Sequence, residues 1–92
     1  MGKKTLTQSF VVPNKLGMHL RAAVLFAKTA GQFSAAIEVQ KHDTTSDGKS
    51  NLGLMMLAAM VGDELIVRVN GDDAPQAMDA IAALFQRKFD ED

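Results

Sequence analysis

The sequence predicts an α+β fold, an open-faced β-sandwich in which three helices cover one face of a four-stranded, mainly antiparallel sheet. The first observation is the order of apolar periodicities, which alternate between two and 3.6 residues in the sequence βαββαβα. The second is that each predicted helix has an apolar stripe, and one sheet face can bury all three. The length of 92 residues is enough for one domain, residues 1–92, and too short for two.

The first strand is predicted over residues 5–12, and a loop follows it. Its apolar side chains recur at alternate positions, with Gln8 as the exception: Leu6, Phe10 and Val12. Pro13 and Gly17 then interrupt the pattern. A helix is predicted over residues 20–30 and ends at Gly31. Its buried stripe is expected to consist of Ala22, Ala23, Phe26, Ala27 and Ala30.

A hairpin and a short helix are predicted next. The inward residues of the second strand are Ala35, Ile37 and Val39. Residues 41–44 are polar and suit a turn into a weak third strand that ends at Ser46. Ser50 is expected to cap a brief helix that begins at Asn51, because serine oxygens accept hydrogen bonds from free N–H groups at helix starts.

The last strand and the third helix complete the fold. The alternation of Leu65, Val67 and Val69 predicts a strand that Gly71 ends. Asp73, with Pro75 and Gln76 after it, is expected to start a helix through a capping box, and Asp72 to assist in capping. The buried stripe of this helix is Ala77, Ile81, Leu84 and Phe85. The acidic end, residues 90–92, is expected to be a frayed, solvated tail.

Composition excludes several classes of function. The formal net charge is −1 without a basic cluster, so we expect no nucleic-acid partner. Cysteine is absent, and His42 beside Asp43 does not make a metal site, so we expect neither metal nor cofactor. The first residues lack the apolar stretch of a signal peptide, so we expect a cytoplasmic monomer without membrane insertion.

His19 is the candidate functional residue, because it comes immediately before the first predicted helix. Unpaired backbone N–H groups of the first turn, including those of Leu20 and Arg21, should point toward its ring. These donors, the helix dipole and the Arg21 guanidinium all favour an anion such as phosphate. A neutral imidazole can attack phosphorus, although a His-x-Arg triplet alone is more often an idle cap.

The longer segment Asn14-Lys15-Leu16-Gly17-Met18-His19-Leu20-Arg21-Ala22-Ala23 resembles the active-site motif of HPr, the histidine phosphocarrier of the bacterial phosphoenolpyruvate-dependent phosphotransferase system. The resemblance continues through residues 48–57 and covers almost the whole chain. It implies that His19 accepts a phosphoryl group at Nδ1 from phosphorylated enzyme I and passes it to an enzyme IIA domain, with Arg21 assisting. The protein is then a carrier and not an independent enzyme.

Two residues depart from the family pattern. Proline is common after the arginine, where this chain has Ala22, and a smaller residue is usual at the position of Leu20. Proline would fix the backbone at the helix start, so Ala22 is expected to loosen the first turn and slow transfer without abolishing it. We therefore expect Ala22→Pro to be tolerated.

Ser50 has two interpretations. As a residue before a helix it serves as an ordinary N-cap. The resemblance of Gly48-Lys49-Ser50 to the regulatory serine region of HPr instead implies phosphorylation by a dedicated kinase, the HPr kinase/phosphorylase. This phosphorylation reduces phosphoryl transfer through His19. An alternative function follows, namely a regulatory binding module that Ser50 phosphorylation controls and that docks to a transcription factor or an enzyme.

The second helix has more apolar residues than one core-facing stripe can bury. Packing should take Leu54 and Leu57 inward. An exposed docking surface for partners is then expected to consist of Leu20, Val24, Leu52 and Met55. Two further residues, Lys28 and Lys49, are equally compatible with contacts to acidic partners and with solvated surface positions.

A small hydrolase or metal-dependent enzyme is disfavoured, because the sequence near His19 has no second histidine, carboxylate pair or nucleophile–base arrangement. Within the carrier class, residues 14–18 and the ending at residues 89–92 resemble the nitrogen-related paralogue, whereas Lys49-Ser50 resembles kinase-regulated HPr. The sugar and nitrogen branches both stay open.

Overall fold

The computed structural model describes residues 4–91. Its elements are β1 (Lys4–Val11), α1 (Leu20–Ala30), β2 (Ala36–Lys41), β3 (Thr44–Asp47), α2 (Asn51–Met56), β4 (Glu64–Gly71), α3 (Ala74–Gln86) and the 3-10 turn η1 (Lys88–Asp90). The strands form one sheet in the order β1-β4-β2-β3, and all neighbouring pairs are antiparallel. The predicted α+β class and the order βαββαβα are confirmed.

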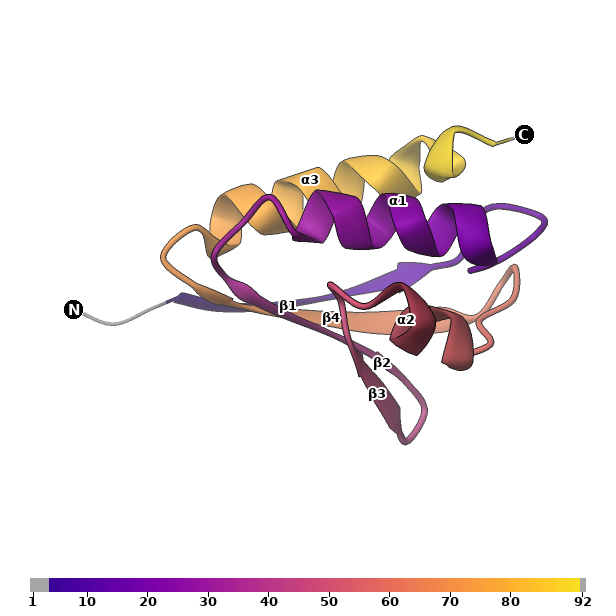
Figure 1. Cartoon of the computed structure of the whole chain (residues 1–92), viewed down its shortest axis with the longest axis horizontal. Helices are drawn as coiled ribbons and strands as arrows, with labels where there is room; N and C mark the ends of the chain where they lie inside the picture. Colours follow the sequence, from indigo (N-terminus) through magenta and orange to yellow (C-terminus); the bar gives the residue numbers. More distant parts are fainter. Residues whose placement is uncertain (1–3, 92) are drawn as a thin grey trace.

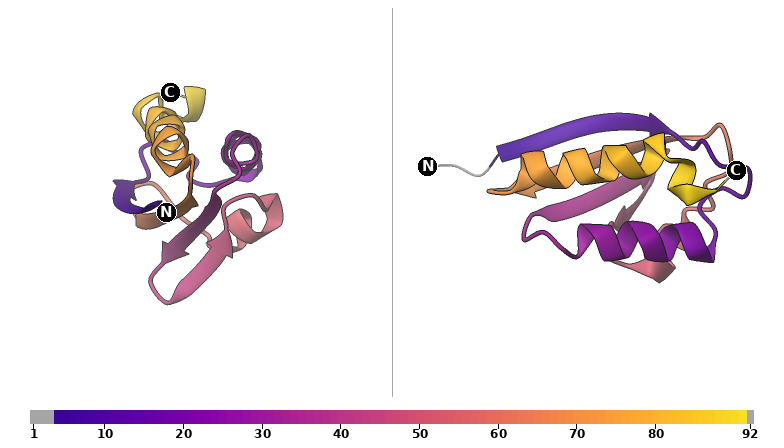
Figure 2. Two further views of the ribbon diagram at one scale, coloured as in Figure 1. Left: turned by 90° about the vertical axis from the view of Figure 1, so that its left-hand side faces the viewer. Right: turned by 90° about the horizontal axis from the view of Figure 1, so that it is seen from above.

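The three helices lie on one face of the sheet, and the opposite face is open (Figure 1; Figure 2, left). Helix α1 packs against both α2 and α3, while α3 also contacts β1 and β4. This arrangement buries the apolar stripes of the helices and the inward side chains of the strands in a single layer. Within residues 4–91, no helix has the length and apolar character needed to cross a membrane.

The core contains the side chains that the periodicities predict. The buried residues of α1 are those predicted, namely Ala22, Ala23, Phe26, Ala27 and Ala30. The strands contribute Ile37, Val39, Leu65, Val67 and Val69, and Ala35 is buried immediately before β2. On the edge strand β1, Leu6 and Phe10 are only partly buried, and Phe10 stacks on Phe85 of α3 with ring centroids 4.4 Å apart.

The predicted capping box of α3 is wrong. Asp73 occupies the N-cap position, but its side chain makes no hydrogen bond to the helix. Its carboxylate accepts instead from the backbone N–H groups of Ser34 (2.8 Å) and Ala35 (2.9 Å), in the loop immediately before β2. The hydrogen bond from Ser34, with that from Ala35, lowers the pKa of Asp73 against an opposing effect of burial. The carboxylate thus connects the segment before α3 to the loop before β2 and gives two backbone donors an acceptor.

The expectation of a frayed acidic end is also wrong for the described residues. The chain turns back after α3, and the Phe89 side chain is fully buried. Its ring packs edge-on against Phe85 with centroids 5.0 Å apart. Burial of an aromatic side chain fixes this segment to the core, and Glu91 consequently has a defined position. Asp92 lies outside the described residues.

Candidate functional site

His19 is the N-cap of α1, as predicted, with an extended backbone (φ −80°, ψ −177°). Its carbonyl accepts a helical hydrogen bond from the Ala23 N–H at 2.9 Å. The ring nitrogen Nδ1 accepts from the Arg21 backbone N–H at 3.3 Å. One edge of the imidazole therefore faces the Arg21 N–H in the first helical turn, at the position where the sequence predicts an anion-binding site.

Glu91 holds the other edge of the ring. The Nε2 atom of His19 lies 2.6 Å from Glu91 Oε2. The same oxygen accepts from Arg21 Nη1 at 3.0 Å, and this guanidinium nitrogen also donates to the Phe89 carbonyl at 3.2 Å. The C-terminal segment thus contacts both residues that the sequence singled out, and in this state Arg21 is paired with a carboxylate.

These contacts determine which ring nitrogen carries the proton in neutral His19. A backbone N–H can only donate, so Nδ1 has its lone pair toward Arg21 and the proton is on Nε2. Burial raises the pKa of the Glu91 carboxyl, but hydrogen bonds from Asn14, His19 and Arg21 outweigh it and hold that pKa below its usual value. Glu91 is ionised at neutral pH and accepts the Nε2 proton.

Asn14 holds the second oxygen of Glu91. The buried Asn14 side chain donates from Nδ2 to Glu91 Oε1 at 3.0 Å and to the Gly17 carbonyl at 2.8 Å. Gly17 has φ +68°, and a Cβ atom there would lie 2.5 Å from the Ala59 carbonyl oxygen. The adjacent Met18 N–H donates to that oxygen at 2.9 Å. The loop before α1 is therefore fixed to the loop after α2, and this positions His19.

Asn14 and Glu91 were not predicted from the sequence as site residues. His19 and Glu91 are 72 positions apart, so no local spacing connects them. The available signal was Phe89, an apolar residue within an otherwise polar ending. A buried residue there implies that its neighbours approach the molecule instead of extending into solvent.

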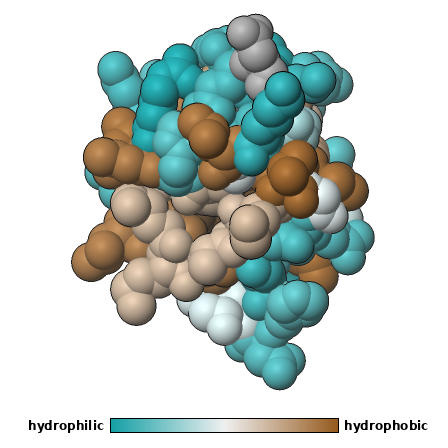
Figure 3. All heavy atoms as spheres, turned by 90° about the vertical axis from the view of Figure 1, so that its right-hand side faces the viewer, coloured by the Kyte–Doolittle hydropathy of each residue, from teal (hydrophilic) through white to brown (hydrophobic). Residues whose placement is uncertain are grey.

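Apolar residues are exposed on α1 and α2, as predicted. Leu54 and Leu57 are buried, whereas Leu20, Val24, Leu52 and Met55 are exposed. The sequence prediction omitted further exposed residues, among them Leu16, Met56, Met60 and Val61. We call these eight exposed residues the apolar surface. The loops at residues 12–19 and 57–63 lie at one end of the molecule (Figure 1). Figure 3 views this end and shows apolar side chains gathered across its middle.

Ser50 caps α2, and its Oγ accepts from the Gly53 N–H at 3.0 Å. Helix α2 begins away from α1's first turn and runs toward the end of the molecule that bears His19 (Figure 1). Lys49 Nζ donates to the Phe33 carbonyl at 2.8 Å, in the loop after α1, and Lys28 is in the last turn of α1. The fold brings Leu20 beside His19 but leaves both lysines at the opposite end of α1.

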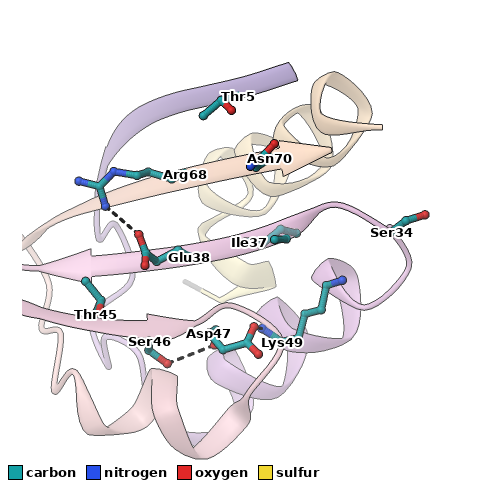
Figure 4. A pocket seen from close by; sticks show the side chains of 11 residues that line it. Thr5, Ser34, Ile37, Glu38, Thr45, Ser46, Asp47, Lys49, Arg68 and Asn70 are labelled. Carbon is teal, nitrogen blue, oxygen red and sulfur yellow. Dashed lines mark hydrogen bonds and ion pairs between the residues drawn. The ribbon is translucent and has the colours of Figure 1, made fainter. Parts of the chain in front are cut away.

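A polar hollow of about 710 Å³ lies away from His19, on the open face of the sheet (Figure 4). Its lining includes Thr5, Glu38, Thr45, Lys49, Arg68 and Asn70. Glu38 and Arg68 form an ion pair across it at 3.0 Å, so two of its charges neutralise each other. Within residues 4–91, no three His, Cys, Asp or Glu side chains are grouped so that they could hold a metal ion.

The fold and the site define a class of protein, a small open-faced α+β phosphocarrier. Residues 6–87 match the family model described as "PTS HPr component phosphorylation site". The chain belongs to the HPr family, the phosphocarriers of the phosphotransferase system. The predicted family and function class are confirmed.

Relatives and a solved structure agree with this assignment. The phosphocarrier protein HPr of Neisseria meningitidis serogroup A is 43% identical over 94% of this chain and 97% of the relative. The phosphocarrier protein NPr of Shewanella violacea is 40% identical over 94% of each chain. The crystal structure of HPr-C-His from Thermoanaerobacter tengcongensis superposes with a TM-score of 0.91 at 34% identity, covering 95% of this chain and 98% of that one. Similarity extends to both HPr and NPr, so the branch stays open.

Proposed function

We propose that His19 is the residue that carries the phosphoryl group. Its Nδ1 attacks the phosphorus of phosphorylated enzyme I, a phosphohistidine forms, and an enzyme IIA domain then accepts the group. The observation that carries this proposal is the orientation of the ring, with the Nδ1 lone pair directed at the first turn of α1. Backbone N–H groups and the helix dipole stabilise the phosphoryl oxygens there.

Arg21 is proposed as the cation that assists transfer. Its side chain is 57% exposed and already lies within hydrogen-bonding distance of Glu91 beside the ring. A guanidinium has several N–H donors, so Arg21 can hold Glu91 with one and a phosphoryl oxygen with another. A lysine at this position would supply charge without the planar fork.

The test is incubation with phosphoenolpyruvate and enzyme I, followed by assay of acid-labile phosphate. Wild-type protein is expected to take up label, and His19→Ala to take up none. His42→Asn is the matched control, because His42 is the other histidine and has φ +52°, a conformation that asparagine accepts. Label that persists in His19→Ala contradicts the proposal.

The apolar surface is proposed as the docking surface for enzyme I and enzyme IIA. It adjoins His19 through Leu20, and α2 supplies exposed methionines, whose flexible side chains fit different partners in turn. Lys28 and Lys49 are proposed only to speed encounter with acidic partners, since Lys49 is bound to the Phe33 carbonyl and both are distant from His19. The expected monomeric state is tested by light scattering.

Ser50 is proposed as a regulatory phosphorylation site for an HPr kinase/phosphorylase. A phosphate there adds about −2 charge beside the exposed Leu52 side chain and thereby weakens docking to the apolar surface. The alternative, a binding module that acts through Ser50 alone, leaves the contacts of His19 with Arg21 and Glu91 without a use. A His19→Ala variant that keeps full biological activity favours that alternative.

A further inference from the structure

We infer that Glu91 is a positioning residue for phosphoryl transfer: its carboxylate keeps the His19 proton on Nε2 and offsets the positive charge that the ring acquires when Nδ1 bonds to phosphorus. The inference rests on the proposed role of His19 and deepens it. It assigns a function to a residue near the end of the chain that the sequence pattern alone marks as solvated.

The first support is the geometry of the carboxylate. The 2.6 Å separation from His19 Nε2 is short, as expected for a charge-assisted hydrogen bond. The Glu91 side chain is only 12% exposed, so the local electrostatic interaction is screened less than at an open surface. Both oxygens are occupied, Oε2 by His19 and Arg21 and Oε1 by Asn14. These three contacts fix the direction from which the carboxylate meets the ring.

The second support is the backbone that delivers Glu91. Lys88, Phe89 and Asp90 are three consecutive non-glycine residues with left-handed φ of 55°, 55° and 60°. That conformation costs roughly 1 kcal/mol or more per residue. It persists where surrounding contacts over-determine it, and such strain concentrates at functional sites. Here the contacts are the burial of Phe89 and the hydrogen bonds of Glu91, so the turn is maintained at a cost and brings Glu91 to His19.

The reaction step is balanced without loss of a proton. The Nδ1 lone pair forms a bond to phosphorus while the bond from phosphorus to the donor breaks, and that electron pair leaves with the donor. His19 Nε2 keeps its proton throughout, so the ring becomes positively charged. The Glu91 carboxylate on the opposite edge offsets that charge. In onward transfer the P–N electron pair returns to Nδ1, and a neutral imidazole is left, still hydrogen-bonded to Glu91.

Arg21 allows this carboxylate to lie beside a phosphoryl group. The Glu91 carboxylate and a phosphoryl group on His19 are both negatively charged and repel each other, and this repulsion opposes phosphorylation. The Arg21 guanidinium bonds Glu91 Oε2 at 3.0 Å and thereby neutralises much of the negative charge that faces the phosphoryl oxygens. With Arg21 shielding the phosphoryl oxygens, the main effect of the Glu91 carboxylate is to offset the positive charge of the His19 ring.

The experiment compares Glu91→Gln with Asp90→Asn in the full chain. Glutamine preserves the shape of the side chain and removes its charge, and its NH2 group replaces one of the two acceptor oxygens. Asp90→Asn removes the same charge one residue earlier, at an exposed pair with Arg87. We expect Glu91→Gln to lower the rate constant for phosphorylation by phospho-enzyme I about tenfold to a hundredfold, the size of a lost charge-assisted contact. Asp90→Asn should retain the wild-type rate.

Nuclear magnetic resonance supplies a readout that a merely structural role does not alter. In wild-type protein, the proton on His19 Nε2 should give a downfield, slowly exchanging signal before and after phosphorylation. The signal should move upfield or vanish in Glu91→Gln and persist in Asp90→Asn, with circular dichroism confirming that each variant is folded.

Three outcomes overturn the inference. These are a wild-type transfer rate in folded Glu91→Gln, an equal loss of rate in Asp90→Asn, and a wild-type spectrum with the ring proton on Nδ1. The position of the ring proton is measured on the wild-type protein. The inference can therefore be contradicted even if Glu91→Gln fails to fold. Absence of label in wild-type protein contradicts the proposed role of His19 instead, while the spectrum still tests the contact between His19 and Glu91.

Discussion

His19 has two neighbours that supply its chemical environment, and they come from different parts of the chain. Arg21 is two residues away, so the contact of its N–H with Nδ1 follows from the local geometry of a helix start. Glu91 reaches Nε2 across the fold. The predicted contact of the ring with the first helical turn is therefore present at one edge, and the contact at the other edge was unforeseen.

At the scale of one residue, we predict that Ala22→Pro folds and transfers phosphate at least as fast as the wild type. Ala22 is the third residue of α1, and the helical hydrogen bond to the His19 carbonyl is donated by Ala23. Proline within the first turn consequently removes no backbone bond of the helix. The free energy of unfolding should change by less than about 1 kcal/mol. Collapse of the fold in thermal unfolding would contradict this.

Ser50 supplies a second prediction at this scale. Ser50→Ala should lower the free energy of unfolding by about 1 kcal/mol, because the Gly53 N–H loses its acceptor. Ser50→Asp retains an acceptor and should preserve stability, while its negative charge reduces transfer from enzyme I. Urea unfolding and transfer rates measure the two effects separately. Equal transfer rates in both variants would argue against Ser50 as a regulatory site.

Among the elements, α2 departs most from a core-facing helix. Its six residues bury only Leu54, and Leu57 follows as a buried C-cap. A short helix cannot present a separate polar face when most of its residues are apolar. The exposed remainder joins side chains of α1 and of the loops to form the apolar surface.

We predict that Met55→Glu slows phosphorylation of His19 by at least about tenfold and leaves the fold intact. Met55 is exposed, so glutamate there meets solvent in the free protein but must be desolvated against a partner. Thr45→Glu, on exposed strand β3, is the matched control and should transfer normally. If the Met55 variant is phosphorylated at the wild-type rate, the apolar surface is not the docking surface.

At the scale of the whole molecule, three carboxylates connect distant segments. Asp63 accepts from the Met60 N–H and pairs with Lys41, and these contacts lower its pKa against desolvation. The pKa values of Asp73 and Glu91 are lowered as well. Each group ties a loop or the C-terminal turn to another part of the structure, so its ionisation is coupled to folding.

We predict that stability declines in acid. A carboxyl whose pKa is lower when folded binds fewer protons than in the unfolded chain, so stability rises with pH. Its contribution is complete above the usual values of 3.8 for Asp and 4.5 for Glu, and it is lost as the pH falls through the lower folded values. Urea unfolding between pH 7 and pH 3 measures this. Glu91→Gln should show a smaller decline, and a stability independent of pH would contradict the prediction.

Much of the fold was predictable because its signals are local. Helix α1 has the predicted bounds and buried residues, and β4 has the predicted inward side chains. A period of two or 3.6 residues is visible within one element, and glycine or serine marks its ends. Asp73 shows the limit of such reasoning. Its position immediately before α3 suits a cap, but its carboxylate accepts a hydrogen bond from another loop.

The sequence by itself determined the helices, the strands, the order of the elements and the place of His19 before α1, because each depends on residues a few positions apart. Only the tertiary structure decided that the acidic end turns back, that Phe89 enters the core and that Glu91 meets His19 Nε2. The turn at residues 88–90 is left-handed without any glycine, so local preference disfavours it. Burial and hydrogen bonds across 72 residues outweigh that preference, and they exist only when the chain is folded.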